Sequence, residues 1–390
     1  MNTPRSVDVV IVGGGISGTA AAYELARHGV NVTLLEQGDL ASMASGWTLA
    51  GVRQSGRHPA ELPLAMAAVQ RWATLNDELD ADVEYRRGGN LRLARTPDEV
   101  PMIQKVVEVG LAQGLDLTYL PDNAAVRAKT PGIAESVLAA SFCPTDGHAN
   151  PTKTVQAFAA AAERYGATIQ TGTTVMGIVA TGGRVTGVRT SDGVIAAGTV
   201  IIAAGIHTQA LIAPFGIALP LRIAVVAAIQ SIPLPPMLAP VLGVAGADLA
   251  GRQQADGRLR FTGAGMPWAH QIADLATSYD RVQPSAGEIA AVVHRVSQVL
   301  PAFAEAPVAR VWGGLLDMTP DALPVLERSS TIDGLIVAAG FSGHGFCLGP
   351  VTGQILRELV VDRRSTLPIE PFGSDRFTSI HDRTPTTLHG

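Results

Sequence analysis

The sequence predicts an α/β fold in which a discontinuous, Rossmann-like dinucleotide-binding domain is interleaved with an α+β domain built on a mixed or antiparallel sheet. Three observations lead to this prediction. The chain opens with a buried strand, a glycine-rich turn and a helix. Short apolar strands of the same kind recur in separated stretches, and the stretches between them carry strands typical of a second sheet. With 390 residues, 47% of them hydrophobic, the chain is large enough for two packed domains.

The opening stretch has the order expected of a dinucleotide-binding unit. A β-branched run leads into GGGISG at residues 13–18, which matches G-x-G-x-x-G, and an alanine-rich helix, a second apolar strand and Glu36 follow. Gly13 permits the tight turn, Gly15 lets the backbone approach a pyrophosphate, and Gly18 allows the helix to pack closely on the strand. Glu36 is placed to accept hydrogen bonds from ribose hydroxyls, and its charge disfavours the 2′-phosphate of NADP.

Composition excludes several classes of partner. A formal net charge of −5 and the lack of any basic run give no reason to expect nucleic acid. Cys143 and Cys347 are far apart, so we expect no disulfide framework and a cytoplasmic location. No signal peptide is expected, and the apolar stretch 223–247 contains prolines that break a membrane-spanning helix. Two explanations for the apolar character of that stretch are open: it packs between the domains, or it forms a lid or a partner-contact patch. No metal-binding motif occurs.

The remaining elements follow from periodicity and turn residues. Helical spacing predicts helices over residues 63–79, 97–110, 124–129, 154–165, 287–300 and 349–361. Apolar or alternating runs predict strands over residues 85–94, 115–120, 168–170, 173–180, 184–190, 199–203, 219–230, 258–261, 309–315 and 335–339. Residues 38–53 are rich in glycine, alanine and serine, which predicts a loop whose backbone lies against a ligand.

These elements divide into two interleaved domains and a terminus. The predicted nucleotide domain comprises residues 1–85, 150–220 and 325–375, the substrate domain residues 86–149 and 221–324, and the loose C-terminal tail residues 376–390. FAD is favoured over NAD, because no second strand–GxGxxG–helix unit occurs and residues 335–361 form a strand, glycine turn and helix with no acid following. That helix N-terminus would face the flavin N1/C2=O edge, where negative charge develops on reduction.

Several blocks of sequence, spread in order along nearly the whole chain, carry a resemblance to a known family. They include the opening unit, DGHANP at residues 146–151, TPDALPV at residues 319–325 and GFSGHGF at residues 340–346. The chain resembles the D-amino-acid oxidase superfamily of FAD enzymes, in the branch of glycine oxidase, sarcosine oxidase and the β subunits of heteromeric amine or imino-acid dehydrogenases. The resemblance implies oxidation of the C–N bond of a small secondary, N-substituted, imino or D-amino acid by hydride transfer to flavin N5, giving an imine that hydrolyses.

The resemblance also implies which residues bind FAD. It places the opening turn on the pyrophosphate, Glu36 and Gln37 at the ribose, a central loop along pyrophosphate and flavin, Val175 at the adenine, and the last glycine-rich turn at the flavin pyrimidine edge. The full set is Gly13, Gly15, Ile16, Ser17, Gly18, Glu36, Gln37, Ser45, Ala50, Gly51, Val52, Val175, Ala204, Gly205, Gly340, Gly343, His344, Gly345 and Phe346.

Departures from the family pattern refine these expectations. No cysteine occurs in residues 313–318, where members with covalent flavin carry one, so FAD is expected to be held non-covalently. Leu316 follows Gly314-Leu315 where glycine oxidase has the arginine that binds the substrate carboxylate, and Cys347 stands where monomeric sarcosine oxidases have a lysine. No lysine occurs after Lys153, which favours a dehydrogenase or β-subunit type over a fast oxidase.

The substrate side rests on a few candidates. Arg53, with Arg57, is the leading candidate for the carboxylate anchor, and a structural ion pair is equally open. His344 is expected at the flavin edge, and His270 is a candidate for the substrate pocket, although a surface or core position is favoured. Oxidation of a 2-hydroxy acid is the alternative chemistry. A flavin-binding subunit of a larger assembly is the alternative class, and a partner subunit or a homo-oligomer remains possible for either chemistry.

Overall fold

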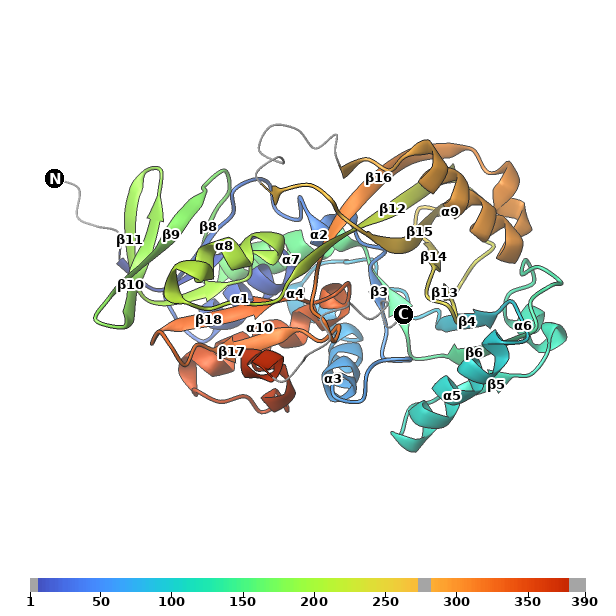
Figure 1. Ribbon diagram of the computed structural model, residues 1–390, viewed down its shortest axis with the longest axis horizontal. Helices are drawn as coiled ribbons and strands as arrows, with labels where there is room; N and C mark the ends of the chain where they lie inside the picture. The colour runs from blue at the N-terminus through green and yellow to red at the C-terminus, as the bar shows by residue number, and fades with distance from the viewer. Residues whose placement is uncertain (1–5, 273–281, 379–390) are drawn as a thin grey trace.

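The computed structural model describes residues 6–272 and 282–378 and has two large β-sheets at opposite ends of an elongated molecule (Figure 1). Helices pack on both sheets, and each sheet combines parallel and antiparallel pairs of strands. The predicted fold class is therefore confirmed. The strands of the first sheet come from residues 6–35, 168–202 and 325–339, and those of the second from residues 90–143 and 222–318. The domain limits stay a prediction.

The first sheet has the order β17-β18-β11-β1-β2-β8, with β10 pairing to β11 and β9 to β10. Its strands are β1 (Ser6–Val12), β2 (Val32–Leu35), β8 (Thr168–Gln170), β9 (Val175–Thr181), β10 (Arg184–Thr190), β11 (Gly193–Ile202), β17 (Val325–Arg328) and β18 (Leu335–Ala339). β1 lies at the centre, parallel to both β2 and β11. Val9 and Ile11 face one buried cluster and Val10 and Val12 the other, which explains the unbroken apolar run.

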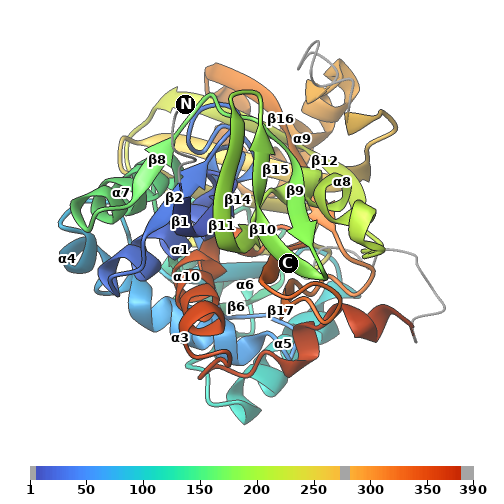
Figure 2. The same cartoon turned by 90° about the vertical axis from the view of Figure 1, so that its left-hand side faces the viewer.

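Helices from distant parts of the chain cover this sheet. α7 (Pro151–Arg164) and α10 (Gly345–Val361) both pack against α1 (Ile16–Arg27) on one side, and α3 (Leu62–Trp72) packs against α10. Figure 2 looks onto this end and shows those helices on one side of the sheet and α8 (Thr208–Ile212) on the other. Gly353 makes the close approach possible, because a Cβ there would lie 2.6 Å from the backbone of Ala20.

The second sheet has the order β16-β12-β15-β14-β13-β4-β6-β5. Its strands are β4 (Asn90–Ala94), β5 (Thr118–Leu120), β6 (Ala139–Cys143), β12 (Arg222–Pro233), β13 (Val241–Val244), β14 (Leu249–Gln253), β15 (Arg258–Pro267) and β16 (Val308–Met318). The helices at this end are α5 (Glu99–Ala112), α6 (Asn123–Lys129) and α9 (Ala286–Val299). A small two-stranded sheet, β3 (Gly51–Val52) with β7 (Gly147–His148), lies apart from both large sheets.

Several predicted elements differ from the observed ones. The helix over residues 63–79 is broken after Trp72 and resumes as α4 (Leu75–Leu79). The strand over residues 85–94 begins only at Asn90, because Gly89 has a φ of 89° and Arg86 pairs instead with His148. The apolar stretch 223–247 contains, after β12, a second strand that was not predicted, β13, which pairs with β4 in parallel. The predicted loop over residues 38–53 contains β3 and the short α2 (Ala44–Trp47).

The first residues of the predicted tail pack against the rest of the chain. Residues 374–378 form a 3-10 turn in which Phe377 is buried and the Arg376 guanidinium donates to the Asp321 carboxylate at 2.7 Å. Residues 379–390 of the predicted tail lie outside the described residues.

Candidate active site

Three adjoining cavities run from the opening turn to the second sheet. The Glu36 cavity is lined by Gly13–Gly15, Glu36–Gln37, Ala41–Ser45, Ala203–His207, Leu315 and Asp317. The Ser45 cavity shares Gly15, Ser45 and Gly205 with it and adds Ile16 and Ser17 with Gly343, Gly345 and Phe346 of the last glycine turn. The Arg57 pocket shares Thr48, Gly343 and Phe346 with the Ser45 cavity and extends to β4 and β13. Together they form one continuous path.

The opening turn shapes the first part of this path through the absence of side chains. Gly13 has a φ of 117°, and a Cβ on it would lie 2.3 Å from the carbonyl oxygen of Ala203. A Cβ on Gly15 would lie 2.9 Å from Ser45 Oγ, at the wall shared by the first two cavities. The N-terminus of α1 points its free N–H groups here, and the Ile16 N–H donates to Ser45 Oγ at 3.0 Å. The turn therefore offers a diphosphate both space and donors.

Glu36 is held in place at the far end of the path. Its carboxylate accepts hydrogen bonds from the Gly14 N–H at 2.6 Å and the Gly38 N–H at 2.8 Å. Each carboxylate oxygen has further acceptor capacity, and the side chain lines the Glu36 cavity. This arrangement suits the hydroxyls of an adenosine ribose.

The path also fits the long, bent shape of FAD. A ribose acceptor, a glycine-lined diphosphate cradle and a helix N-terminus follow one another in the order in which FAD carries adenosine, diphosphate and flavin. Phe346 and Gly343, at the start of α10, line the stretch where the flavin would enter the Arg57 pocket. The described residues thus fit the ribose, the diphosphate and the flavin of the cofactor.

His344 lies at the N-terminus of α10 and lines the Arg57 pocket. It is buried, and its Nδ1 lies 2.9 Å from Oε2 of the fully buried Glu61. Burial lowers the pKa of His344 to about 4, and Arg57 acts in the same direction. The imidazole is therefore neutral at physiological pH and donates its Nδ1 hydrogen to Glu61, because that carboxylate can only accept.

Three arginines gather at the same end of the pocket. Arg53, Arg57 and Arg92 all line it, and the Nη1 atom of the buried Arg57 has no hydrogen-bond partner among the described residues. Oε1 of Glu61 lies 3.9 Å from that atom. Burial, with the charge of Arg57, lowers the pKa of Arg92 to about 10, so its guanidinium is still charged at neutral pH.

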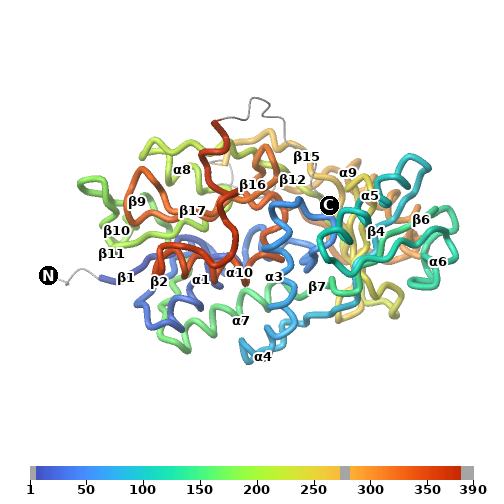
Figure 3. The backbone as a smooth tube through the Cα atoms, turned by 90° about the horizontal axis from the view of Figure 1, so that it is seen from below, coloured from blue at the N-terminus to red at the C-terminus, as the bar shows by residue number. Residues whose placement is uncertain are grey.

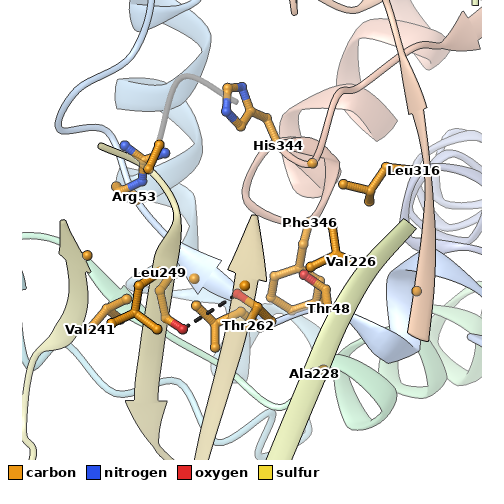
Figure 4. Close-up of a pocket in the computed structure, with 18 of the residues that line it drawn as sticks. Thr48, Arg53, Val226, Ala228, Val241, Leu249, Thr262, Leu316, His344 and Phe346 are labelled. Carbon is orange, nitrogen blue, oxygen red and sulfur yellow. Dashed lines mark hydrogen bonds between the residues drawn. The ribbon is translucent and has the colours of Figure 1, made fainter. Parts of the chain in front are cut away.

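The rest of the pocket is apolar. Figure 4 shows Arg53 and His344 toward one end, with Leu249, Val241, Val226 and Phe346 among the side chains that surround the remaining space. No aspartate or glutamate lines the pocket within the described part of the chain. The pocket therefore combines a cationic end with an apolar body, which suits a small anion with a carbon skeleton.

Comparison with known proteins agrees with this geometry. The family model described as DAO, FAD dependent oxidoreductase, matches residues 8–359. The chain belongs to the DAO family of FAD-dependent oxidoreductases. The β subunit of sarcosine oxidase from an Arthrobacter species is 31% identical to it, over 97% of this chain and 92% of that protein.

Solved structures of DAO-type enzymes superpose closely on this DAO-family chain. L-proline dehydrogenase from P. horikoshii has a TM-score of 0.87 at 27% identity, covering 96% of this chain and 99% of that one. Glycine oxidase from Geobacillus kaustophilus has a TM-score of 0.87 at 25% identity, covering 95% of this chain and 98% of that one. The prediction of an FAD-dependent oxidoreductase is confirmed, and the comparisons do not favour the 2-hydroxy-acid alternative.

Most of the residues expected at the cofactor of this DAO-family enzyme line the path. They are Gly13, Gly15, Ile16, Ser17, Glu36, Gln37, Ser45, Gly51, Ala204, Gly205, Gly343, His344, Gly345 and Phe346. Five others lie outside the three cavities: Gly18, Ala50, Val52, Val175 and Gly340. Gly18 instead packs on the Gly13 carbonyl, where a Cβ would lie 2.0 Å away, and the Gly340 N–H donates to Asp317 at 2.7 Å.

The three substrate-side candidates are placed differently from one another. Arg53 and His344 line the Arg57 pocket together. Arg53 also directs its Nη1 to the carbonyl oxygen of Ser55 at 2.5 Å. His270 is exposed, stacks edge-on against Trp268 at 5.7 Å, and lines none of the three cavities.

Sequence reasoning missed four polar residues of the site. Arg92 is one of the three arginines, and the carboxylates of Glu61 and Asp146 lie near them. Asp317 lines the first two cavities. Arg92 lies within β4, and no local sequence pattern distinguishes it as a site residue. Its position at the pocket follows from the pairing of β4 with β13.

No helix in the described part of the chain is long and apolar enough to cross a membrane. The described residues also contain no cluster of histidine, cysteine and acidic side chains that could hold a metal ion.

Proposed function

We propose that this enzyme oxidises the C–N bond of a small amino acid, with the substrate carboxylate at Arg57 and Arg92 and the carbon skeleton in the apolar part of the Arg57 pocket. The observation that carries the proposal is the buried Nη1 of Arg57, which has no hydrogen-bond partner among the described residues and lies in a pocket whose described lining contains no acidic residue. A buried donor left without a partner costs about 1–3 kcal/mol, and a carboxylate would remove that cost. Secondary or N-substituted, imino and D-amino acids are the candidate substrates.

The same pocket favours a neutral amine. FAD, when bound, supplies the hydride acceptor for oxidation of the substrate. The described lining offers no carboxylate to stabilise an ammonium group, and desolvation alone lowers the pKa of an amine. His344 donates to Glu61 through Nδ1. Its proposed role is to hold the Glu61 carboxylate beside Arg57.

The proposed carboxylate anchor differs from the sequence-based expectation in one respect. Arg57 is retained, but Arg92 takes the place of Arg53 as its neighbour, because a guanidinium nitrogen of Arg53 is bonded to the Ser55 carbonyl. Arg53 is proposed instead to fix the loop that carries Arg57, whose Nε donates to the Arg53 carbonyl at 3.0 Å.

Relatives support the substrate class and suggest an assembly. One relative is named as a sarcosine oxidase subunit and others as glycine oxidase and proline dehydrogenase. A partner subunit or a homo-oligomer is therefore part of the proposal, as are non-covalent FAD, a dehydrogenase type of electron transfer and a cytoplasmic location. The buried free thiols of Cys143 and Cys347 suit a reducing compartment.

Anaerobic mixing with a substrate panel tests the proposal. We expect sarcosine, glycine, D-alanine, L-proline or D-proline to bleach the flavin absorbance, and lactate to leave it unchanged. Arg57→Gln should weaken substrate binding at least tenfold, whereas Arg310→Gln, an exposed arginine on β16, should not. Bleaching by lactate but by none of the amines would overturn the proposal. Bleaching that requires a copurified partner would identify the chain as one subunit of the enzyme.

A further inference from the structure

A second cavity lies beneath α5 and shares three lining residues with the Arg57 pocket, two of them arginines. This α5 chamber is lined by residues of α5, by Gln54 and Gly56, by Leu62 and by the 245–247 turn. Arg57 and Arg92 line both the α5 chamber and the Arg57 pocket. Figure 3 shows α5 beside β4 and β6, at the end of the molecule away from the first sheet. The two guanidinium-bearing side chains thus stand between the chamber and the pocket.

The loop at this boundary fits closely against the shared arginines. Gly56 has a φ of 65°, and a Cβ there would lie 3.1 Å from Cζ and both Nη atoms of Arg92. The Arg92 guanidinium therefore lies directly over the Gly56 backbone. Ala247, which also lines both spaces, has a φ of 54° in a tight turn. No bulky apolar side chain is shared by the two linings.

The charges of the chamber point to an anion. Its charged lining residues in the described chain are Arg57, Arg92 and Lys105, and no acidic residue lines it. Lys105 is exposed at the outer end and pairs with Glu108 at 3.0 Å, whereas the two arginines are buried at the inner end. An anion moving inward would leave a solvated lysine and meet Arg57 Nη1, which has no hydrogen-bond partner among the described residues.

We propose that the α5 chamber is a carboxylate-binding vestibule through which anionic substrate reaches the Arg57 pocket, passing from one side of the Arg57–Arg92 pair to the other. The inference rests on the proposed function, because it needs a carboxylate ligand in the pocket. Both faces of the arginine pair border a cavity. A carboxylate can therefore exchange its hydrogen bonds from the guanidinium atoms that face the chamber to those that face the pocket.

Narrowing the chamber tests this route. Val106 and Val109 are half-buried on α5, line the chamber and do not line the pocket. Benzoate binding to the FAD-loaded enzyme is followed by stopped-flow perturbation of the flavin spectrum. For Val106→Trp we expect the association and dissociation rate constants to fall together, at least fivefold, with an unchanged Kd. Val109→Trp serves as an independent second variant.

Leu111→Trp is the matched control, because Leu111 is exposed on the same helix and lines neither cavity. It should leave both rate constants unchanged. Unchanged rate constants in both chamber variants at wild-type flavin content would overturn the route. A changed Kd with an unchanged association rate would also overturn it, since the chamber would then act on the bound state. Failure of benzoate to perturb wild-type flavin at any concentration would instead overturn the proposed carboxylate pocket, and the vestibule with it.

Discussion

Nδ1 of His344 lies 2.9 Å from Oε2 of Glu61, and both side chains are buried at the mouth of α10. Burial alone would raise the pKa of Glu61, but His344, Arg57 and Arg53 outweigh it and lower that pKa to about 2. Glu61 is therefore the fixed negative charge of the site, and His344 is a neutral donor to it. The pair links the proposed flavin edge to the arginines that face the substrate.

The neutral state of His344 predicts a specific acid lability. Its pKa falls from an ordinary 6.5 to about 4 in the folded protein, so the unfolded chain binds more protons between these values. Stability contributed by the neutral imidazole is complete above pH 6.5 and is lost as the pH falls toward 4. In His344→Asn, which retains a donor to Glu61, the melting temperature should decline less steeply over that window. An unchanged slope would show that His344 is charged in the folded state.

Asp317 should behave in the opposite way. Burial raises its pKa from 3.8 to about 6, so the folded state binds more protons between these values and stability falls as the pH rises through them. The shift corresponds to about 3 kcal/mol at most. Asp317→Asn can still accept the Gly340 N–H, and it should raise the melting temperature at pH 8 by several degrees more than at pH 4.

Asp321 supplies the control for that comparison. Although burial opposes it, the Arg376 guanidinium lowers the pKa of this carboxyl, so its contribution is present at neutral pH and is lost in acid. Asp321→Asn should therefore lower the melting temperature at pH 8 and have less effect at pH 4. If both variants shift in the same direction at pH 8, burial does not govern Asp317.

The glycine cradle predicts how the cofactor is lost. In Gly15→Ala the new Cβ would lie 2.9 Å from Ser45 Oγ and would occupy the wall between the first two cavities. We expect the purified protein to retain less than a tenth of the wild-type flavin absorbance, with an unchanged circular dichroism spectrum. Gly177→Ala, where a Cβ meets nothing within 4 Å, should retain full flavin. Full retention by Gly15→Ala would place the diphosphate elsewhere.

The parts of this molecule that could be predicted from the sequence are those fixed by local rules. Gly13, Gly15 and Glu36 belong to one strand–turn–helix–strand unit, and their spacing alone determines that they meet at one end of β1. The turn before α10 follows the same rule, although the helix begins at Gly345, earlier than the periodicity indicated.

The polar contacts beyond those units depend on long-range pairing. Arg57 meets Arg92 because β4 joins a sheet with β13, a strand hidden in an apolar stretch, and Glu61 meets His344 across almost the whole chain. Asp146 accepts hydrogen bonds from the backbone of Gln54 and Ser55, which orders the loop of the arginines. Neither periodicity nor residue propensity encodes contacts between residues so far apart in the sequence. The sequence could therefore indicate that charged residues belong to the site, but not which of them contact one another.

Arg252 gives the last prediction, because it is a buried cation that holds the loop before β3 and has no acidic partner among the described residues. Its Nε donates to the Leu49 carbonyl and its Nη1 lies 2.7 Å from His148 Nδ1, while Nη2 has no hydrogen-bond partner in the described chain. Burial, aided by Arg252, lowers the pKa of His148 to about 3, so this imidazole is the neutral acceptor. The guanidinium thus holds the backbone just before β3.

Arg252→Met keeps the volume of the side chain but leaves the Leu49 carbonyl and His148 without their donor. Two buried acceptors without partners cost on the order of 2–4 kcal/mol. Thr48, Leu49 and Gly51 line the Arg57 pocket, so the loosened loop should also release flavin faster. We expect a lower melting temperature and a several-fold faster loss of flavin on dilution. Arg258 lies on the neighbouring β15 and forms a partly exposed ion pair with Asp256. Arg258→Met removes that pair and should change neither the melting temperature nor the rate of flavin loss. If Arg252→Met lowers the melting temperature but releases flavin at the wild-type rate, Arg252 stabilises the sheet and does not hold the loop.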